Sequence, residues 1–357
     1  MKILIVGAGP TGLTTALELG RNGITPTIVD AKDEPSTLSR AVGILPRSID
    51  ILSRTGVSEN ILKEGLHLKK MHIQRGQKTL INLDIEKYLH GKDFLILLPQ
   101  NRTESIMAEK LSEMGITVAY GVKVSEIVNN DTDATVTFSD GHKETYDWVV
   151  GADGINSTVR TQAGIPFLGY ELDEDWSIAD VELSSGFDDS LMQAWLLKGE
   201  RNERDACLML PIAENRVRIV SSTPDSLKAL PIKLDIKNVR RSGDFRIPIK
   251  QAEQYVKGRI VLAGDAAHSH SPVGGRGMNL GIEDASSLVE HLLAGTMNTY
   301  EKERIKKGKA VIRGTEFARK LLVSNNIFVI FATKVVAFSV THVPFVRKKF
   351  FERLGRL

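Results

Sequence analysis

The stretch Ile3-Leu4-Ile5-Val6-Gly7-Ala8-Gly9-Pro10-Thr11-Gly12 lies at the start of the chain and decides its fold class. Its four consecutive apolar residues predict a buried parallel strand at Ile3–Val6, because a strand covered on both faces carries apolar side chains at every position. Apolar residues recur at helical spacing after Gly12, and a second strand is predicted at Thr25–Asp30. Strand, helix and strand form a βαβ unit, so we expect an α/β protein with a parallel sheet.

The glycines of this stretch form a G-x-G-x-x-G pattern between strand and helix, the context in which the pattern predicts a dinucleotide site. Gly7 permits a tight turn, Gly9 lets the backbone approach a pyrophosphate, and Gly12 lets helix and strand pack closely. The free N–H groups at the helix start attract the phosphates. Asp30, at the end of the second strand, would bind an adenosine ribose and repel a 2′-phosphate, which favours FAD or NAD over NADP. A plain glycine turn is the alternative.

Two further segments favour FAD over NAD. The run Gly258–His268 predicts a strand that brings Asp265 to a loop, where its carboxylate could hold the ribityl hydroxyls of a flavin. The glycine-rich Pro272–Asn279 follows, and only small residues allow a flat ring to lie on the backbone. A helix beginning near Gly281 could direct its N–H groups at that ring. The third segment, Val150–Arg160, lies between the other two in the sequence.

These three segments, in this order, resemble those of the class A flavoprotein monooxygenases, the aromatic-ring hydroxylases of the p-hydroxybenzoate hydroxylase type. The resemblance extends over nearly the whole chain. It includes Ser39–Ile44 with Arg47, and Pro99-Gln100 followed by Glu104. A Rossmann-like FAD-binding domain with an inserted substrate domain is the fold that this family implies.

The resemblance also implies a set of cofactor contacts. Arg40 and Gln100 would contact the ribose, ribityl or phosphate groups of FAD, and Val124 would meet the adenine with its backbone. Asp153 and Arg160 would support the pyrophosphate region and the transient docking of NAD(P)H, although surface ion pairs are the alternative for both arginines. The residues expected to bind FAD are Gly7, Gly9, Pro10, Thr11, Gly12, Asp30, Arg40, Gln100, Val124, Asp153, Arg160, Gly264, Asp265, Pro272, Gly277, Met278 and Asn279.

The chemistry that the resemblance implies is carried by the cofactor. NAD(P)H would reduce FAD, and the reduced flavin would form a C4a-hydroperoxide with O2 and hydroxylate an aromatic or polycyclic small molecule. No catalytic residue is marked by its spacing. His268 and His270 lack matching acidic or cysteine ligands, so we expect them to line or support the flavin site and expect no metal.

Other flavin chemistries are the competing hypotheses. A reductase or dehydrogenase of a lipid-like substrate, without oxygen insertion, is poorly separated from a hydroxylase by sequence. A flavin-dependent halogenase is disfavoured, because Trp148, Trp176 and Trp195 are isolated and form no W-x-W-x-I-P motif. A disulfide reductase is excluded by the lone Cys207. A flavin-binding protein without activity would show no NAD(P)H turnover.

The strand pattern predicts a discontinuous first domain that wraps around a second. A meander is predicted at Lys123–Val128, Ala134–Phe138 and Glu144–Val150. Strands that suggest a separate, mixed sheet follow at Trp176–Leu183, Ala194–Leu197, Ala206–Leu210 and Arg216–Ser221. The expected organisation is an FAD-binding domain of residues 1–70, 99–167 and 252–300, a substrate-binding domain of residues 71–98 and 168–251, and basic C-terminal helices over 301–357.

The net charge of +3 hides an uneven distribution. Residues 301–357 carry 14 Lys and Arg against four Asp and Glu, whereas the first 300 residues carry 33 against 40. No nucleic-acid partner is therefore expected. The apolar run Ile327–Val340 is shorter than the roughly 20 residues that span a bilayer. We expect a helix that bridges both domains there, with weak peripheral attachment to anionic lipid as the alternative.

The beginning of the chain contains no pattern typical of a signal peptide, because its first apolar run is only four residues long. A cytoplasmic location, with the membrane surface as the alternative, is the resulting expectation. The oligomeric state is not predicted by any feature of the sequence.

Overall fold

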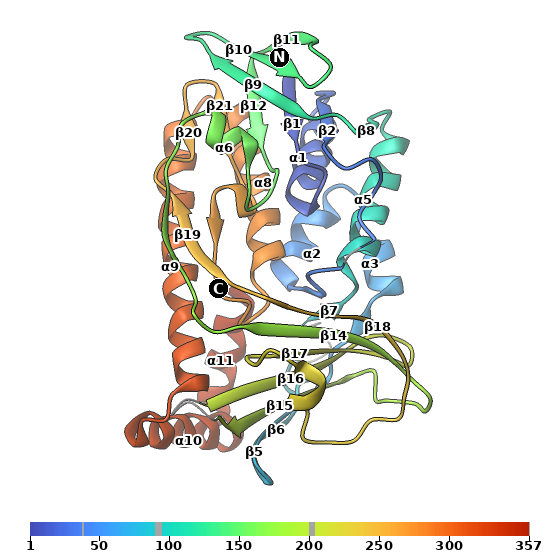
Figure 1. The fold of residues 1–357 in the computed structure, drawn as a ribbon, viewed down its shortest axis with the longest axis vertical. Helices are drawn as coiled ribbons and strands as arrows, with labels where there is room; N and C mark the ends of the chain where they lie inside the picture. Colours follow the sequence, from blue (N-terminus) through green and yellow to red (C-terminus); the bar gives the residue numbers. More distant parts are fainter. Residues whose placement is uncertain (38, 90–94, 200–203, 357) are drawn as a thin grey trace.

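The computed structural model describes residues 1–37, 39–89, 95–199 and 204–356 (Figure 1). Its upper half contains a six-stranded sheet in the order β20-β21-β12-β1-β2-β8. All neighbouring pairs are parallel except β20 with β21. The strands are β20 (Val256–Lys257), β21 (Ile260–Leu262), β12 (Trp148–Gly151), β1 (Ile3–Val6), β2 (Thr27–Asp30) and β8 (Val118–Tyr120).

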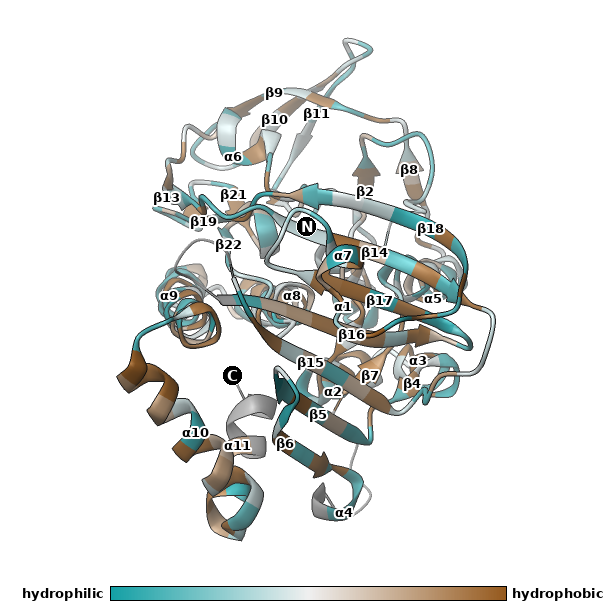
Figure 2. Ribbon diagram, turned by 60° about the horizontal axis from the view of Figure 1, so that its bottom comes forward, coloured by the Kyte–Doolittle hydropathy of each residue, from teal (hydrophilic) through white to brown (hydrophobic). Residues whose placement is uncertain are grey.

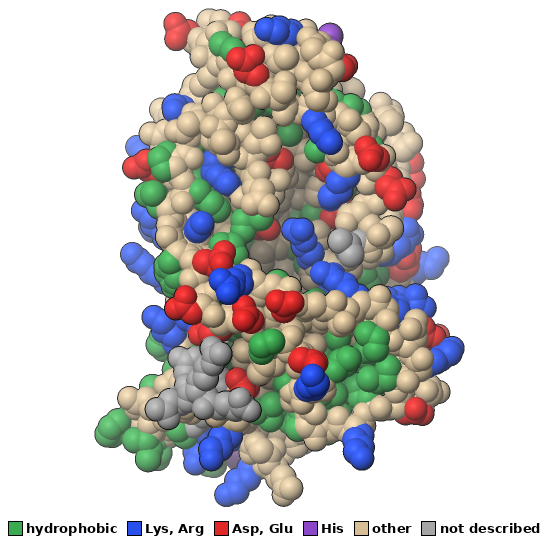
Figure 3. All heavy atoms as spheres, in the orientation of Figure 1, with side chains coloured by type: hydrophobic (Ala, Val, Ile, Leu, Met, Phe, Trp, Pro, Cys, Tyr) green, Lys and Arg blue, Asp and Glu red, His purple; other side chains and the backbone are tan. Residues whose placement is uncertain are grey.

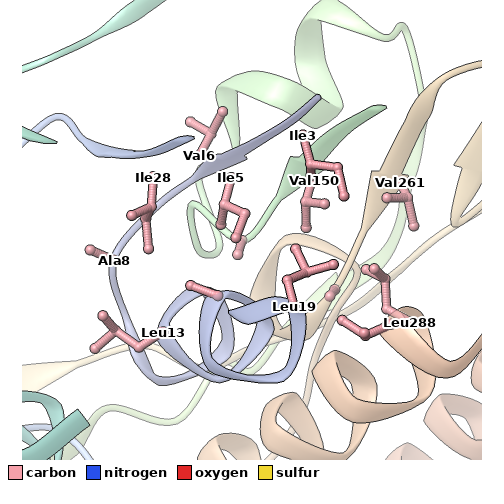
Figure 4. Packing of buried hydrophobic residues seen from close by; sticks show 14 of the residues in the cluster. Ile3, Ile5, Val6, Ala8, Leu13, Leu19, Ile28, Val150, Val261 and Leu288 are labelled. Carbon is pink, nitrogen blue, oxygen red and sulfur yellow. The ribbon is translucent and has the colours of Figure 1, made fainter. Parts of the chain in front are cut away.

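Strand β1 occupies the middle of this sheet, between β12 and β2. All four of its side chains are buried, as its unbroken apolar sequence requires. Figure 4 shows side chains of the sheet meeting Leu19 of α1 (Pro10–Arg21) and Leu288 of α8 (Gly277–Leu293). This core thus joins the beginning of the chain to α8, more than 250 residues later.

A three-stranded antiparallel meander follows the sheet's outer strand β8. Its strands are β9 (Val124–Asn129), β10 (Ala134–Phe138) and β11 (Lys143–Tyr146). The prediction of one strand over Glu144–Val150 was wrong, because the chain changes sheets at Asp147. Tyr146 pairs with Ala134 in the meander, whereas Trp148 pairs with Ile3 in the parallel sheet.

The lower half contains a seven-stranded sheet in the order β18-β14-β17-β16-β15-β5-β6 (Figure 1). It is mixed, as predicted, since β15 and β5 are parallel while the other neighbours are antiparallel. Its strands are β18 (Ile236–Phe245), β14 (Trp176–Leu183), β17 (Arg216–Ser221), β16 (Arg204–Ala213), β15 (Leu191–Lys198), β5 (Lys70–Arg75) and β6 (Lys78–Asp84).

Two small sheets and several further helices complete the described chain before α8. One sheet has the order β3-β7-β4, and the other β13-β19-β22. The strands are β3 (Gly43–Ile44), β7 (Ile96–Leu97), β4 (Leu66–His67), β13 (Phe167–Glu171), β19 (Pro248–Ala252) and β22 (His268–Ser269). The helices are α2 (Pro46–Ser53), α3 (Ser58–Glu64), α4 (Glu86–Leu89), α5 (Gln100–Glu113), α6 (Thr158–Gln162) and α7 (Ser226–Ala229), with a 3₁₀ turn at Gly264–Ala266.

The C-terminal part is helical, as expected. Helix α8 begins at Gly277, four residues before the predicted start. It is followed by α9 (Met297–Val323), α10 (Ile327–His342) and α11 (Pro344–Arg356), and α9 runs along the side of the molecule past both large sheets (Figure 1). Over the described residues no single helix is long and apolar enough to cross a membrane. Helices α9 and α10 satisfy that criterion only together, bent by 106°.

Candidate functional site

The turn between β1 and α1 is too close to neighbouring backbone for side chains at two of its glycines. Gly7 has a φ of 105°, and a Cβ on it would overlap the carbonyl oxygen of Ala152 on the third segment. A Cβ on Gly12 would overlap the carbonyl oxygen of Gly7. No atom of the described residues lies within 4 Å of the position that a Cβ on Gly9 would take. The turn is therefore packed on its protein side and open at Gly9, where a pyrophosphate would approach.

Helix α1 begins directly after Gly9, which occupies its N-cap without a side-chain hydrogen bond to the helix. Pro10 stands in the first turn, where its lack of an N–H costs nothing. The remaining N–H groups at this helix start are available to an anion.

A pocket of about 220 Å³ lies beside this turn, at the carboxyl end of β2. Asp30, Lys32, Glu104 and Tyr120 contribute to its wall. Asp30 Oδ2 accepts a hydrogen bond from Ala8 N at 2.8 Å, so the carboxylate also holds the glycine turn against β2. Burial raises the pKa of Glu104, against a smaller effect of its hydrogen bond from Gln100. A pocket with this lining suits a ribose and its adenine.

Gln100 and Val124 are each connected to this region through a neighbouring residue. Gln100 Oε1 accepts from Ala41 N at 2.9 Å, and its Nε2 donates to Glu104 Oε1 at 2.8 Å. The segment before Val124 is held to β2 because Val122 N donates to the carbonyl of Asp30 at 3.0 Å. Val124 itself is buried at the start of β9, which leaves its main chain as the part that could meet an adenine.

Thr11 brings the first and second segments together. A Cβ on Gly264 or on Gly281 would overlap the Thr11 hydroxyl, so both glycines make room for this side chain. Gly264 has a φ of 62° and begins the turn that carries Asp265. The contact sets the start of α1 next to the start of α8.

The Asp265 side chain is exposed and faces the start of α8. Its Oδ1 lies 4.0 Å from the position that a Cβ on Gly277 would take. No hydrogen bond to this carboxylate is found among the described residues. Arg276 occupies the N-cap of α8 without capping it through its side chain. A free carboxylate beside a free helix start can hold hydroxyl and carbonyl groups of one ligand.

The residues of the Pro272–Asn279 loop differ from one another in their exposure to solvent. Pro272 is exposed, whereas Met278 is buried. Asn279 makes four hydrogen bonds within the protein: Nδ2 donates to the carbonyls of Gly43 and Gly275, and Oδ1 accepts from Leu45 N and Ser48 Oγ. Its side chain thus ties this loop to residues 43–48, and its main chain is what remains for a cofactor.

Asp153 and Arg160 are both turned into the protein. Asp153 Oδ1 accepts from Ser157 Oγ at 2.5 Å, and burial raises the pKa of this carboxyl. Arg160 Nη1 donates to the carbonyl of Ala266 at 2.9 Å, and its guanidinium lies 3.9 Å from the ring centre of Phe167. Arg160 is therefore no surface ion pair but a buried support for the turn that carries Asp265. The side chain of Arg40, in contrast, is exposed.

A buried charge cluster behind Asp265 was not predicted from the sequence. Asp284 Oδ2 accepts from Gly264 N at 2.9 Å and lies 2.6 Å from His268 Nε2, while its Oδ1 lies 2.5 Å from Arg304 Nε. Burial raises the pKa of Asp284, but Arg304 and His268 outweigh it and lower the pKa to about 2. His268 is buried against Asp284, and its role as a support of the flavin site stays a prediction. Its pairing with Asp284, 16 residues later in a helix, follows no motif.

A second unpredicted ion pair lies within the seven-stranded sheet and contacts the loop that carries Arg40. Arg218 on β17 contacts Asp180 on β14 and also donates to the carbonyls of Ser39 and Arg40 at 2.8 and 2.7 Å. The segment that carries Arg40 is thereby attached to the seven-stranded sheet. Figure 3 shows a hollow on this face of the molecule, with Lys and Arg side chains beside it, above the region of β14.

The geometry fits FAD. The glycine turn has an open side at Gly9, the pocket beside Asp30 suits a ribose, and the exposed Asp265 lies at the start of α8. The packing of Gly264 and Gly281 on Thr11 places the start of α1 next to the turn that carries Asp265. Each predicted contact remains a prediction at the level of the single residue.

Comparisons with known proteins agree with this cofactor. The family described as "FAD binding domain" matches residues 1–229 and 233–315. The uncharacterized aromatic compound monooxygenase YhjG of Bacillus subtilis (strain 168) is 28% identical over 355 residues, which cover 90% of this chain and 68% of that protein. The para-nitrophenol 4-monooxygenase of Pseudomonas sp. (strain WBC-3) is 29% identical over 320 residues, covering 83% and 78%.

The fold is also that of a solved structure. The p-nitrophenol 4-monooxygenase PnpA from Pseudomonas putida DLL-E4 superimposes with a TM-score of 0.87 at 23% identity, covering 99% of this chain and 98% of that one. The match to the family extends over most of the chain and includes all three glycine- and acid-bearing segments. The chain therefore belongs to the FAD-binding-domain family and is an FAD-dependent class A monooxygenase of the p-hydroxybenzoate hydroxylase type.

Proposed function

We propose that this chain hydroxylates an aromatic or polycyclic small molecule, with NAD(P)H as the electron donor and O2 as the oxidant. In the overall reaction NAD(P)H and a proton supply two electrons and two protons, one oxygen atom enters a C–H bond, and the other leaves as water. FAD, when bound, supplies electron acceptance from NAD(P)H and the activation of O2. The chain's own residues bind and orient the reactants and exclude water.

The observation that carries the proposal is the arrangement of Gly9, Asp265 and Gly277: Gly9 is open at the start of α1, and Asp265 is exposed beside the start of α8. This arrangement offers one end to a pyrophosphate and the other to a flat ring. Support for an aromatic substrate comes from the named relatives, which include an aromatic compound monooxygenase and a para-nitrophenol 4-monooxygenase.

We call the Pro272–Asn279 loop the flavin loop. An apolar cluster beside it also supports an aromatic substrate. Trp176, Ile247 and Ile249 are buried together, and Val273 of the flavin loop packs against them. The indole Nε1 of Trp176 is buried and has no hydrogen-bond partner within the described residues. A donor in an apolar wall next to the flavin loop suits an aromatic substrate that carries a polar substituent.

We further propose that residues 71–98 and 168–251 form the substrate-binding domain, residues 1–70, 99–167 and 252–300 the FAD-binding domain, and residues 301–357 a basic helical segment. The pairing of β5 with β15 supports the first assignment, because it joins the two separate stretches in one sheet.

The decisive experiment measures the fate of oxygen. Purified protein with FAD is given NADH or NADPH, a panel of phenols and polycyclic aromatics, and ¹⁸O2, and the products are analysed by mass spectrometry. A product that gains one ¹⁸O atom supports the hydroxylase. Equal turnover under nitrogen, with no labelled product, would replace it with the reductase or dehydrogenase reaction. Absence of NAD(P)H oxidation with every substrate would leave a flavin-binding protein without this activity.

A further inference from the structure

Helix α10 turns its large apolar side chains away from the protein. Phe328, Phe331 and Phe338 are 80%, 67% and 62% exposed, and Val335 is 47% exposed. Residues 328, 331, 335 and 338 are spaced by three or four positions, so they form one stripe along the helix. A helix on the surface of a water-soluble domain ordinarily shows polar residues on this side.

The opposite side of α10 holds it to the protein through small and medium side chains. Ala337 and Val340 are buried in an apolar cluster with Leu83 of β6. Figure 2 shows α10 brown over most of its length, at the edge of the molecule beside α11 and near β6. The apolar stripe is therefore a second face, and it is not the one that packs on the seven-stranded sheet.

Only positive charges accompany this stripe. The sequence between Phe317 and Phe351 contains no Asp or Glu. Two of its arginines are used internally, since Arg319 pairs with Glu174 and Glu316 and Arg347 donates to main-chain carbonyls of α10. The other basic residues have exposed side chains: Lys320, Lys334, Lys348 and Lys349.

We infer that α10, with the basic start of α11, is a docking surface for a bilayer that contains anionic lipid. Exposed phenylalanine side chains enter the boundary between headgroups and acyl chains, and the lysines contact the headgroups. The helix lies in the membrane plane, because its 16 residues are too few to cross the bilayer. A second copy of this chain fits the stripe less well, since it would place lysines opposite lysines.

Vesicle sedimentation at low ionic strength tests this inference on the full chain. We expect binding to vesicles of phosphatidylcholine with phosphatidylglycerol and much less binding to phosphatidylcholine alone. The variant F328S/F331S should lose binding at least tenfold. The matched control V128S/L168S removes two exposed apolar side chains of β9 and β13 and should bind like the parent chain. Neutralising the three lysines in K334Q/K348Q/K349Q should weaken binding on the order of a hundredfold.

Two results would overturn the inference. One is equal binding of the parent chain and F328S/F331S to anionic vesicles. The other is a lipid-free dimer that F328S/F331S abolishes, together with no vesicle binding by the parent chain, which would assign the stripe to a second copy. FAD content and the far-ultraviolet circular dichroism of each variant report whether its fold is intact, so a folding failure is separated from a lost surface. The inference does not depend on the proposed reaction.

Discussion

Arg218 donates two hydrogen bonds to Asp180 inside the seven-stranded sheet, from Nε to Oδ1 and from Nη2 to Oδ2, each 2.7 Å long. Both side chains are buried, and the guanidinium also donates to the carbonyls of Ser39 and Arg40. Strand β17 thus holds the loop that carries Arg40. A pair of this kind is costly to break, because the remaining partner becomes an uncompensated buried charge.

Replacing Arg218 by Ala should therefore lower the free energy of unfolding by about 3–5 kcal/mol, as urea unfolding of the flavin-free protein would measure. The matched control is Arg246→Ala, which removes an exposed arginine that pairs with Asp175 on the surface. That change should cost no more than about 1 kcal/mol. Equal losses in the two variants would contradict the role given to Arg218.

The sequence pattern predicted strands whose boundaries are marked by neighbouring residues in the chain. Ile3–Val6 is buried on both faces and reads as one apolar run, and the Ala134–Phe138 strand is bounded by turn residues. The strand expected over 144–150 was wrong because the chain changes sheets at Asp147, and a single Asp between strand-favouring residues is too weak a turn signal to divide the run.

The unpredicted parts of the site depend on contacts between distant segments. Asp284 accepts a hydrogen bond from the N–H of Gly264, which lies 20 residues earlier in the chain. Its other partner, Arg304, lies 20 residues later. Nothing in the spacing of these residues marks them as partners. Asn279 was expected at the flavin, but its side chain is used by the 43–48 segment, which only the folded chain brings near.

The charge cluster at Asp284 predicts a pH dependence of stability. Burial opposes the charged form, but Arg304 and His268 outweigh it and lower the pKa of Asp284 to about 2, below its ordinary value of 3.8. A carboxyl with a lowered folded-state pKa stabilises the fold above pH 3.8, and this contribution disappears as the pH falls toward 2. The shift corresponds to about 2 kcal/mol at neutral pH.

Asp284→Asn should remove the pH-dependent contribution of this carboxylate to the free energy of unfolding. Urea unfolding of the flavin-free protein between pH 2 and pH 6 should show that the stability difference from the parent chain shrinks as the pH falls below 4. The control Asp131→Asn changes an exposed loop carboxyl and should follow the parent curve. A difference for Asp284→Asn that stays constant with pH would contradict the assignment.

Two glycines of the first turn should respond differently to alanine. A Cβ on Gly12 would overlap the Gly7 carbonyl oxygen, whereas a Cβ on Gly9 would have no atom of the described chain within 4 Å. We expect Gly12→Ala to destabilise the flavin-free protein by about 3 kcal/mol. Gly9→Ala should leave that stability within about 1 kcal/mol of the parent value but weaken FAD binding at least tenfold, because its methyl group occupies the side where the pyrophosphate would lie. Urea unfolding measures the effect on stability, and FAD titration measures the effect on cofactor binding. Normal FAD affinity in Gly9→Ala would contradict the prediction that the pyrophosphate lies at this turn.

Asp265 should contribute to FAD binding without contributing to the fold. Its side chain is exposed, and within the described chain no hydrogen bond to it is found, so Asp265→Ala should leave urea unfolding of the flavin-free protein unchanged. The same change should weaken FAD binding by about 10- to 100-fold, since it removes charge-assisted hydrogen bonds to hydroxyl groups of the cofactor. Flavin fluorescence during titration with FAD measures the effect, and Asp131→Ala serves as the control for the loss of an exposed carboxylate. If Asp265→Ala retained FAD as tightly as the control, the ribityl chain would have to lie away from the turn that carries Asp265. The placement of the flavin ring over residues 272–279 would then be wrong as well.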